Sequence, residues 1–477
     1  MLRAFIALAG VSSSACQITW ESFLSVNAAY NLETGPRSLG PSASTAFYKT
    51  LGPAASLDAC ATAATIWRNA SAPADRCLSA VWLHDPSNAT FRDTCWCMPQ
   101  PKWIPAEDKG ADSARLLWPC ASDVDCSLNG ECNAASGACE CDFGWRGPRC
   151  GELALGAVDR ANPGLREINI TTGRNISTWG APVLFDGATS TWHAWASEMV
   201  NECGLNSWRS NSQIVHSTST DGPLGPWARN EVVQPVFAHE PNVVRGPSGE
   251  WVMVWSAFPL PNASSDRCTN CTDGTTSPVY PRGGCGPDAM HGFKQMMAIA
   301  QSPAGPWDAF EIPQLSWGWD SNLAIGIRDD GSAVGLIRAG MVWRAPHYAN
   351  ASSWQPSAAP EGPQLPDDTN VEDPFVWLDR KGRFHAVFHN MEPSDGTDYC
   401  GIHAFSIDGE RWTSGGWSFG GTVNFTDGTQ FTFSRRERPH LLFKDDGSLL
   451  ALSSGAQYGG PFQGDGVFTL INPIVAS

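Results

Sequence analysis

The sequence has no long hydrophobic run beyond its first residues and is poor in positive charge. After residue 15, no apolar run approaches the roughly 20 residues that a membrane-spanning helix needs. The 31 Lys and Arg residues are outnumbered by 48 Asp and Glu, which gives a formal net charge of −17 at pH 7. Nucleic acids and anionic membranes attract basic proteins, so this charge disfavours both as partners. The net charge alone does not identify any other partner.

The first 15 residues predict a secretory signal. A short basic start is followed by the apolar run 4–11 and by small residues, with cleavage expected after Ala15. A buried N-terminal helix is the alternative. Secretion fits the 16 cysteines, because disulfides persist in oxidising compartments. It also fits the eight N-x-Ser/Thr glycosylation sequons at Asn69, Asn88, Asn169, Asn175, Asn262, Asn270, Asn350 and Asn424.

One sequence motif, which we call the repeated phrase, occurs five times after residue 152. It consists of an acidic residue, often a Pro, an apolar run, a Gly turn and a second run rich in aromatics. The three clearest copies begin at Pro241, Pro374 and Pro439, and a Gly follows each Pro after eight residues. Weaker copies begin at Pro182 and Ser321. This rhythm predicts a mainly β fold, with a five-bladed β-propeller of four-stranded units over 152–477. The last copy has room for only three strands, so a segment before Pro182 should supply the missing one.

Six cysteines between residues 120 and 150 are separated by five, five, six, one and eight residues. With the ending Gly144-Trp145-Arg146-Gly147, this segment resembles an EGF-like module over 120–151. Six cysteines alone allow 15 pairings. The resemblance implies the pairs Cys120–Cys132, Cys126–Cys139 and Cys141–Cys150. Calcium-binding residues are not evident at its start, so we interpret it as a structural spacer.

The segment 16–119 carries Cys60, Cys77, Cys95 and Cys97 and weakly resembles a PAN/apple-like module, which implies contacts with carbohydrate or protein. A disulfide-tied cap without a ligand is the alternative. The pairing of the other cysteines stays open, and Cys268-x2-Cys271 favours a disulfide over zinc because no paired Cys/His set follows. The remaining cysteines are Cys16, Cys203, Cys268, Cys271, Cys285 and Cys400.

In a propeller the first strand of each blade lines the central channel, so residues beside the repeated Pro should converge. The residues just before that position are Ala181, Glu240, Asp320, Asp373 and Arg438, and those one earlier are Gly180, His239, Trp319, Glu372 and Glu437. Clustered carboxylates push their pKa values apart, which lets a proton donor and a base coexist. Glycoside hydrolysis needs such a pair, roughly 5 to 5.5 Å apart for retention or roughly 6.5 to 9.5 Å for inversion.

The propeller region resembles glycoside hydrolase family 43, on Glu372-Asp373-Pro374, Glu240-Pro241 and the Gly-Pro-Trp turns ending at Trp227 and Trp307. The resemblance implies an inverting mechanism with an Asp base in the first blade, an Asp that tunes pKa and a Glu acid. Here Ala181 stands where the base is expected. We therefore predict Glu372 as acid, Asp320 as tuning residue, and Glu240 or Glu437 as an unusual base.

A glycan-binding or adhesion protein that has lost turnover is the alternative function. The residues expected to bind the sugar are Asp373, Arg438, Trp319, Trp377, His389 and His239. An acidic site would disfavour sulfated or uronic polysaccharides unless Arg438 or a cation compensates. No metal ligand set is identified, although the channel could hold a structural calcium, and the N-terminal and EGF-like modules could contact proteins.

Structural roles compete with these functional ones. Glu437 and Arg438 could form a buried pair, and Asp373 could cap a turn. Asn242 and Asn322, matched between blades, could be turn residues or sugar ligands. Four histidines in blade strands are expected as hydrogen-bonded core residues: His193, His216, His385 and His403.

Overall fold

A computed structural model describes two compact parts of the chain. It describes the backbone of four strands before residue 116, and then residues 120–168, 171–173, 175–258, 265, 268, 292–316, 321–357, 371–391, 401–458 and 467–476. One unit comprises residues 1–121, 133–138 and 366–368, and the other holds most of the remaining chain. Within the described residues, no helix is long and apolar enough to cross a membrane.

The first unit contains an antiparallel four-stranded sheet with the order β1-β3-β2-β4. Its strands are β1 (Lys49–Pro53), β2 (Ser79–Leu83), β3 (Thr94–Met98) and β4 (Ala111–Arg115). Cys95 and Cys97 fall on β3, whereas Cys60 and Cys77 lie outside the described residues. The apple-like resemblance stays a prediction.

The EGF-like segment has short elements held by disulfides. These elements are η3 (Asp123–Cys126), β5 (Gly130–Asn133), β6 (Ala138–Cys141), β7 (Trp145–Arg146) and β8 (Glu152–Leu153). The structure contains the expected bonds Cys126–Cys139 and Cys141–Cys150. Cys120 and Cys132 are also disulfide-bonded. A further disulfide joins Cys203 to Cys268 in the propeller region.

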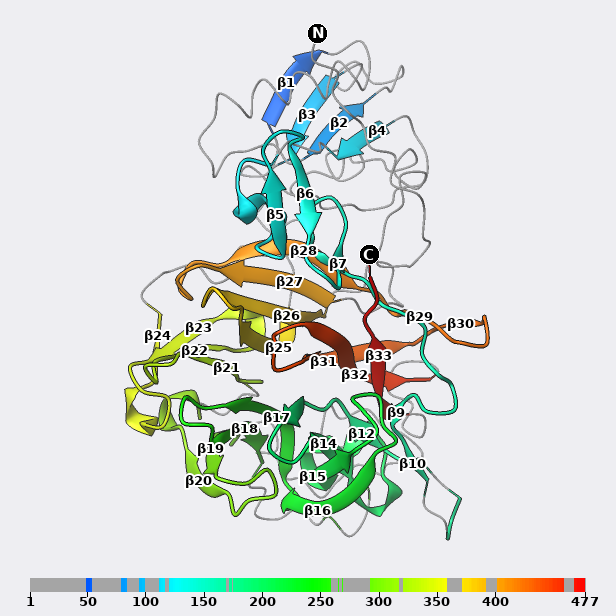
Figure 1. Cartoon of the computed structure of the whole chain (residues 1–477), viewed down its shortest axis with the longest axis vertical. Coiled ribbons are helices and arrows are strands. Elements are labelled where there is room, and N and C mark those ends of the chain that lie inside the picture. Colours follow the sequence, from blue (N-terminus) through cyan, green and yellow to red (C-terminus); the bar gives the residue numbers. More distant parts are fainter. Residues whose placement is uncertain are drawn as a thin grey trace. The chain divides into compact units, whose positions relative to one another are not determined.

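The rest of the described chain forms five antiparallel sheets in sequence order, which are the blades of a propeller (Figure 1). Blade 1 holds β12 (Thr178–Trp179), β13 (Val183–Asp186), β14 (Thr191–Met199), β15 (Ser212–Ser219) and β16 (Ala228–Gln234). Blade 2 holds β17 (Ala238–Arg245), β18 (Trp251–Ala257), β19 (Lys294–Ala300) and β20 (Asp308–Glu311). Blade 3 holds β21 (Ala324–Ile327), β22 (Ala333–Leu336), β23 (Val342–Ala345) and β24 (Gln355–Pro356).

Blade 4 holds β25 (Val371–Leu378), β26 (Phe384–Asn390), β27 (Gly401–Ser406) and β28 (Thr413–Phe419). Blade 5 holds β31 (Arg435–Phe443), β32 (Leu449–Gln457), β33 (Val467–Pro473) and β9 (Gly164–Leu165). Two hairpins complete the strands: β10 (Glu167–Ile168) with β11 (Asn175–Ile176), and β29 (Thr422–Asn424) with β30 (Gln430–Thr432). The short helices are η4 (Val200–Glu202), η5 (Leu205–Ser207), α4 (Trp208–Asn211), η6 (Pro313–Leu315), η7 (Arg338–Gly340) and η8 (Ala351–Ser353).

The innermost strands close into a ring. In sequence, β13, β17, β21, β25 and β31 each contact the next, and β31 contacts β13. The last sheet is completed by β9, whose Leu165 pairs with Thr469 of β33. Gly164 allows this pairing because its φ is 133° and a Cβ there would lie 2.4 Å from the carbonyl oxygen of Thr469. The five-bladed fold and the expected closing strand are both confirmed.

The repeated Pro lies inside a strand and does not open it. β17, β25 and β31 begin three or four residues before that Pro, and each shifts register around it. The shift is a β-bulge, in which two residues oppose one on the partner strand and the unpaired residue needs no ladder donor. In blade 1 the interruption is longer, and residues 180–182 separate β12 from β13.

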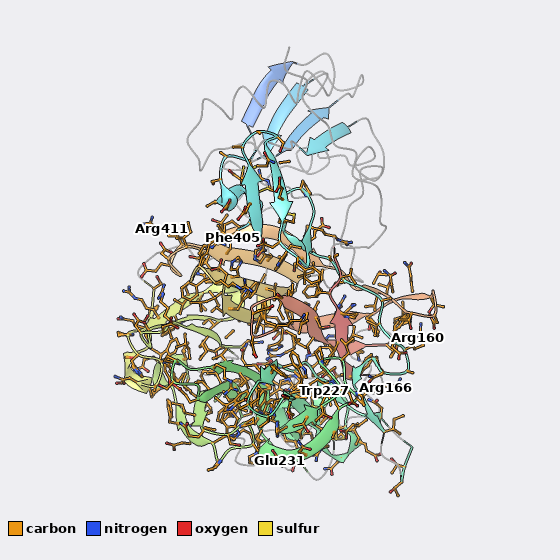
Figure 2. All side chains as sticks on the ribbon, viewed as in Figure 1. Arg160, Arg166, Trp227, Glu231, Phe405 and Arg411 are labelled. Atoms are coloured by element: carbon orange, nitrogen blue, oxygen red, sulfur yellow. A yellow bond between two sulfur atoms is a disulfide. The ribbon has the colours of Figure 1, made fainter. Side chains whose placement is uncertain are left out.

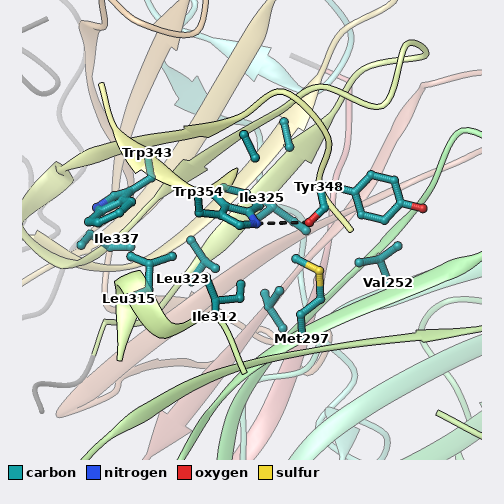
Figure 3. Packing of buried hydrophobic residues seen from close by; sticks show 13 residues of the cluster. Val252, Met297, Ile312, Leu315, Leu323, Ile325, Ile337, Trp343, Tyr348 and Trp354 are labelled. Carbon is teal, nitrogen blue, oxygen red and sulfur yellow. Dashed lines mark hydrogen bonds between the residues drawn. The ribbon is translucent and has the colours of Figure 1, made fainter. Parts of the chain in front are cut away.

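Apolar clusters between neighbouring blades make the core. The cluster between blades 2 and 3 includes Val252 and Met297 on one side and Ile325 and Trp354 on the other (Figure 3). The indole of Trp354 is almost completely buried and donates a hydrogen bond of 3.1 Å to the backbone carbonyl of Tyr348. Burial of these side chains ties adjacent blades together.

The EGF-like segment packs on blade 4. The ring of Trp145 lies 4.9 Å from that of His403 and stacks on Trp377 at 6.4 Å, between ring centroids. The amide Nδ2 of Asn129 lies 3.3 Å from Nε2 of His403. These contacts attach the segment to the propeller.

Backbone atoms also meet across this contact. A Cβ on Gly151 would lie 2.1 Å from the carbonyl oxygen of Gly415, so this close approach requires glycine. Arg383 of blade 4 donates a hydrogen bond of 3.0 Å to the carbonyl of Leu128.

Three of the eight sequons fall on described residues. Asn350 and Asn424 are exposed, which suits glycan attachment. The amide of Asn175 donates a hydrogen bond of 2.9 Å to the carbonyl of Val467. The other five sequons lie outside the described residues.

Two buried histidine pairs occupy matching places in blades 1 and 4. In blade 1, His193 Nδ1 lies 2.8 Å from His216 Nε2, and His216 Nδ1 lies 2.6 Å from Glu231. Figure 2 labels Glu231, which belongs to the outer strand β16. In blade 4, His385 Nδ1 lies 3.1 Å from His403 Nε2. These histidines are core residues with hydrogen-bond partners, as expected.

We expect the blade 1 pair to make stability fall in mild acid. Burial and the neighbouring His216 lower the pKa of His193 from 6.5 to about 4. Between these values the unfolded chain binds a proton that the folded chain does not, so the free energy of unfolding falls as pH falls. His193→Gln should flatten the dependence of the urea midpoint on pH between 6.5 and 4. The exposed His347, changed to Gln, is the control, and an unchanged slope in His193→Gln would contradict the assignment.

Candidate functional site

Each blade places one residue with left-handed backbone at the end of the ring where the innermost strands begin. Their φ angles lie between 49° and 62°, and the residues are Gly180, Glu240, Asn322, Asp373 and Arg438. Such angles are costly for non-glycine residues and persist where surrounding structure enforces them. The bulges aim the side chains inward, so that the four polar ones meet.

These side chains form a buried polar ring around the propeller axis. Asn322 Nδ2 donates hydrogen bonds to Asp373 at 2.5 Å and to Glu240 at 3.3 Å. Arg438 Nη1 lies 2.9 Å from Asp373 Oδ1 and 3.6 Å from Glu240 Oε1. The backbone N–H of Arg438 adds a hydrogen bond of 3.2 Å to Asp373. Both carboxylates are thus bridged by the same two side chains.

The structure corrects the expected register in two blades. The ring position of blade 1 is Gly180 and not Ala181, because its interruption is longer. The ring position of blade 3 is Asn322, whereas Asp320 and Trp319 lie outside the described residues. Blade 1 still contributes no carboxylate at this position. A Cβ on Gly180 would lie 2.5 Å from the Cβ of Arg438, so glycine is needed there for close packing as well as for its φ.

A second group of charges lies beside the ring and alternates in sign. Arg338 of η7 forms an ion pair of 3.0 Å with Glu372, whose other oxygen lies 3.3 Å from His389 Nδ1. His389 Nε2 lies 3.8 Å from Glu437. Arg435 binds Glu437 with two hydrogen bonds, of 2.6 and 2.7 Å. We call these five residues the charge chain; they come from blades 3, 4 and 5.

Adjacent carboxyl groups here have opposite pKa shifts. Burial, and then the charge of Asp373, raise the pKa of Glu372. Burial also acts to raise the pKa of Asp373, but Arg438, His389 and Asn322 outweigh it, and the pKa lies below its usual value. Burial would lower the pKa of His389, yet Glu437 and Glu372 raise it. A carboxyl with a raised pKa beside one with a lowered pKa is the arrangement that acid catalysis uses.

Four of these residues could together hold a metal ion. Glu372, Asp373, His389 and Glu437 each offer a ligand atom, and these atoms lie within 4.8 Å of one another. Calcium prefers an all-oxygen shell, and imidazole suits transition metals better. The three carboxylates already have arginine partners, so their charge is compensated without an ion.

The remaining predicted residues lie in different places. His239 is buried beside the ring, with Nδ1 2.7 Å from the hydroxyl of Ser212, and burial and then Arg438 lower its pKa. Trp377 lies apart from the cluster and contacts the EGF-like segment. The expected pair of Glu437 with Arg438 does not form, because Arg435 binds Glu437.

Sequence reasoning missed Arg338 and Arg435. Arg338 lies on η7, outside the repeated phrase, and no sequence signal marked it. Arg435 precedes Glu437 by two residues on one strand, so both side chains point to the same face. That spacing is a signal that could have found it.

Comparisons with known proteins agree with this description of the modules. Residues 122–152 match the family model of a Teneurin-like EGF domain, which confirms the EGF-like segment. No curated protein matches the chain.

Solved structures with a similar fold include three glycan-related proteins, and the expected likeness to family 43 propellers is confirmed. An endo-arabinase from Bacteroides thetaiotaomicron is 13% identical, with a TM-score of 0.37, covering 66% of this chain and 98% of its own. An alpha-L-arabinofuranosidase from Lactobacillus brevis is 13% identical, with a TM-score of 0.38, covering 61% and 89%. A GH43 protein from Bacillus licheniformis is 13% identical, with a TM-score of 0.40, covering 65% of this chain and 54% of its own. Likenesses at this level carry no activity over to this chain.

Proposed function

We propose that this chain is a secreted, glycan-active protein that hydrolyses glycosidic bonds, with Glu372 as the general acid. The observation that carries the proposal is the pair of adjacent buried carboxyl groups, in which Glu372 contacts Arg338 and His389 and Asp373 contacts Arg438 and Asn322. Burial and the charge of Asp373 raise the pKa of Glu372, whereas Arg438 outweighs burial and lowers the pKa of Asp373. A carboxyl with a raised pKa can protonate the oxygen of a leaving sugar. The disulfides and the EGF-like module favour an extracellular site of action.

The other ring residues have supporting roles in this proposal. Asp373 keeps its charge through Arg438 and Asn322, and that charge raises the pKa of Glu372, so Asp373 takes the tuning role first expected for Asp320. Glu240 and Glu437 remain the candidates for the second carboxylate. Glu437 is the better placed, because its ligand atom lies within 4.8 Å of that of Glu372. This upper limit is closer to the roughly 5 to 5.5 Å of retaining enzymes than to the roughly 6.5 to 9.5 Å of inverting ones.

In this mechanism the carboxylate of Glu437 attacks the anomeric carbon while Glu372 gives its proton to the leaving oxygen. Water then cleaves the glycosyl–Glu437 ester, and Glu372 takes a proton from that water. Arg435 holds both oxygens of Glu437 and fixes its orientation. The product keeps its anomeric configuration.

A binding protein without turnover is the second candidate. Blade 1 places Gly180 in the ring, and no described carboxylate replaces the expected base there. The described carboxylates of the cluster are all ion-paired or hydrogen-bonded, which suits a rigid binding site.

The test is binding and turnover of glycans by the full chain. An array identifies ligands, and the oligosaccharides found are then incubated with the parent and with Glu372→Gln. We expect kcat to fall roughly 10²- to 10⁴-fold in Glu372→Gln, because general acid catalysis contributes about that much. Glu231→Gln, a half-buried carboxylate on the outer strand of blade 1, is the control and should keep full activity. Proton NMR of the first product gives its configuration.

Ligand binding without turnover by the parent would favour the binding protein. Equal turnover by the parent and Glu372→Gln would remove Glu372 from the role of acid. An inverted product would exclude attack by Glu437 and return Glu240 as the candidate base.

A further inference from the structure

In the charge chain, the two arginine side chains are more exposed to solvent than the two glutamate side chains. The side chain of Arg338 is 37% exposed and that of Arg435 is 16% exposed, whereas those of Glu372 and Glu437 are 11% and 3% exposed. His389, at the middle of the chain, is only 1% exposed. The two ends of the chain are therefore the groups that an arriving ligand meets first.

The site is also less acidic than its sequence suggested. Four carboxylates, on Glu240, Glu372, Asp373 and Glu437, face three guanidinium groups and an imidazole. Arg338 binds Glu372, Arg435 binds Glu437, and Arg438 lies between Asp373 and Glu240. Each of these four carboxylates therefore has a guanidinium within 4 Å, so their charge does not by itself exclude an acidic polysaccharide.

The backbone positions Arg338 for contact with a ligand. It begins η7, a single turn between β22 and β23 in which Ala339 has a φ of 62°. The N–H of Arg338 donates a hydrogen bond of 2.9 Å to the carbonyl of Ser321, next to the ring residue Asn322. This turn brings a guanidinium from the second and third strands of blade 3 to the polar ring.

We propose that Arg338 and Arg435 recognise an anionic group, a carboxylate or a sulfate, on the sugar that this site takes. The inference rests on the proposed function and names its substrate class as acidic glycans. A guanidinium binds either group through two parallel N–H···O bonds, which gives both affinity and orientation. The underlying carboxylates hold the two forks in place before the ligand arrives, which reduces the entropy lost on binding.

The inference is tested by titrating the full chain with three trisaccharides of similar shape. They are built from galacturonic acid, from galactose and from sulfated galactose. Calorimetric titration at low salt should show at least about tenfold tighter binding of an acidic trimer than of the neutral one, as expected for a charge-assisted pair. The uronate and sulfate trimers distinguish the two anionic groups. Added salt should reduce the preference.

Variants then connect the preference to the arginine. Arg338→Gln should bring the acidic-to-neutral affinity ratio close to one, and Arg338→Lys should keep part of it, because the charge remains and the fork is lost. Arg380→Gln, on an exposed side chain in the turn between β25 and β26, is the control and should keep the parent ratio.

The outcomes separate this inference from the proposed function. Neutral glycans that bind or turn over as well as acidic ones would overturn the inference and leave the proposed function standing. The same holds if an acidic preference survives in Arg338→Gln. A chain that binds no glycan on the array, acidic or neutral, overturns both.

Discussion

Replacing Arg438 with Met is expected to destabilise the protein by about 3 to 5 kcal/mol, the usual cost of leaving a buried charge without its partner. Arg438 is 4% exposed and lies between Asp373 and Glu240, which are both buried. Met fills a similar volume but compensates neither carboxylate. Denaturant unfolding at pH 7 measures the change.

The stability difference between Arg438→Met and the parent should also depend on pH. In the parent the pKa of Asp373 is lowered, so its contribution to stability is present above its ordinary pKa of 3.8 and is lost as pH falls through the lowered value. In Arg438→Met the carboxyl takes up a proton at a higher pH, so the difference between variant and parent should narrow as the solution is acidified. Arg380→Met, on a surface side chain, should cost less than about 1 kcal/mol. A variant as stable as the parent at pH 7 would show that the ring does not depend on Arg438.

Ala181→Asp is expected to destabilise the fold without adding a catalytic base. From the sequence, this change seemed able to restore the missing carboxylate of blade 1. In the structure Ala181 is fully buried in an apolar cluster with Val183 and Leu442, and the ring position is Gly180. A carboxyl group without a partner in such a cluster costs on the order of 4 kcal/mol or takes up a proton.

Urea unfolding and glycan turnover of the variant are the two measurements. The same substitution on the surface, Ala228→Asp on the outer strand of blade 1, should change stability by less than about 0.5 kcal/mol. Parent-like stability together with new or faster turnover in Ala181→Asp would place residue 181, and not 180, in the site.

The sequence was sufficient for the architecture because each blade repeats a local pattern. An eight-residue interval from Pro to Gly sets a strand and its hairpin, and that interval survives in blades 2, 4 and 5. Blade 1 has a longer interruption of its inner strand, and its register was misplaced by one residue. Blade 3 lacks the Pro, and its register was misplaced by two residues. Glu240 and Asp373 were found because they belong to the repeated phrase.

The partners of these residues could not be predicted. Glu437 has an arginine on either side in the sequence, at 436 and 438, yet it binds Arg435. Strand geometry explains this choice, because Arg435 shares its face and the bulge turns Arg438 toward Asp373. Arg338 reaches Glu372 from another blade, and only the closed ring brings the two together. The EGF-like segment contacts blade 4 partly through the backbone of Gly151 and Gly415. Such backbone contacts leave no pattern of side chains in the sequence from which they could be predicted.

The closing strand sets an order for assembly on the ribosome. Leu165 emerges early, but its partner Thr469 follows roughly 300 residues later, and such distant pairing slows folding. Until β33 is synthesised, β9 has no strand to pair with, and blade 5 lacks its two outer strands. The first blades can form while synthesis continues, whereas the ring cannot close until β33 has left the exit tunnel. Until then blade 5 has unpaired strand edges, which favour association with other chains.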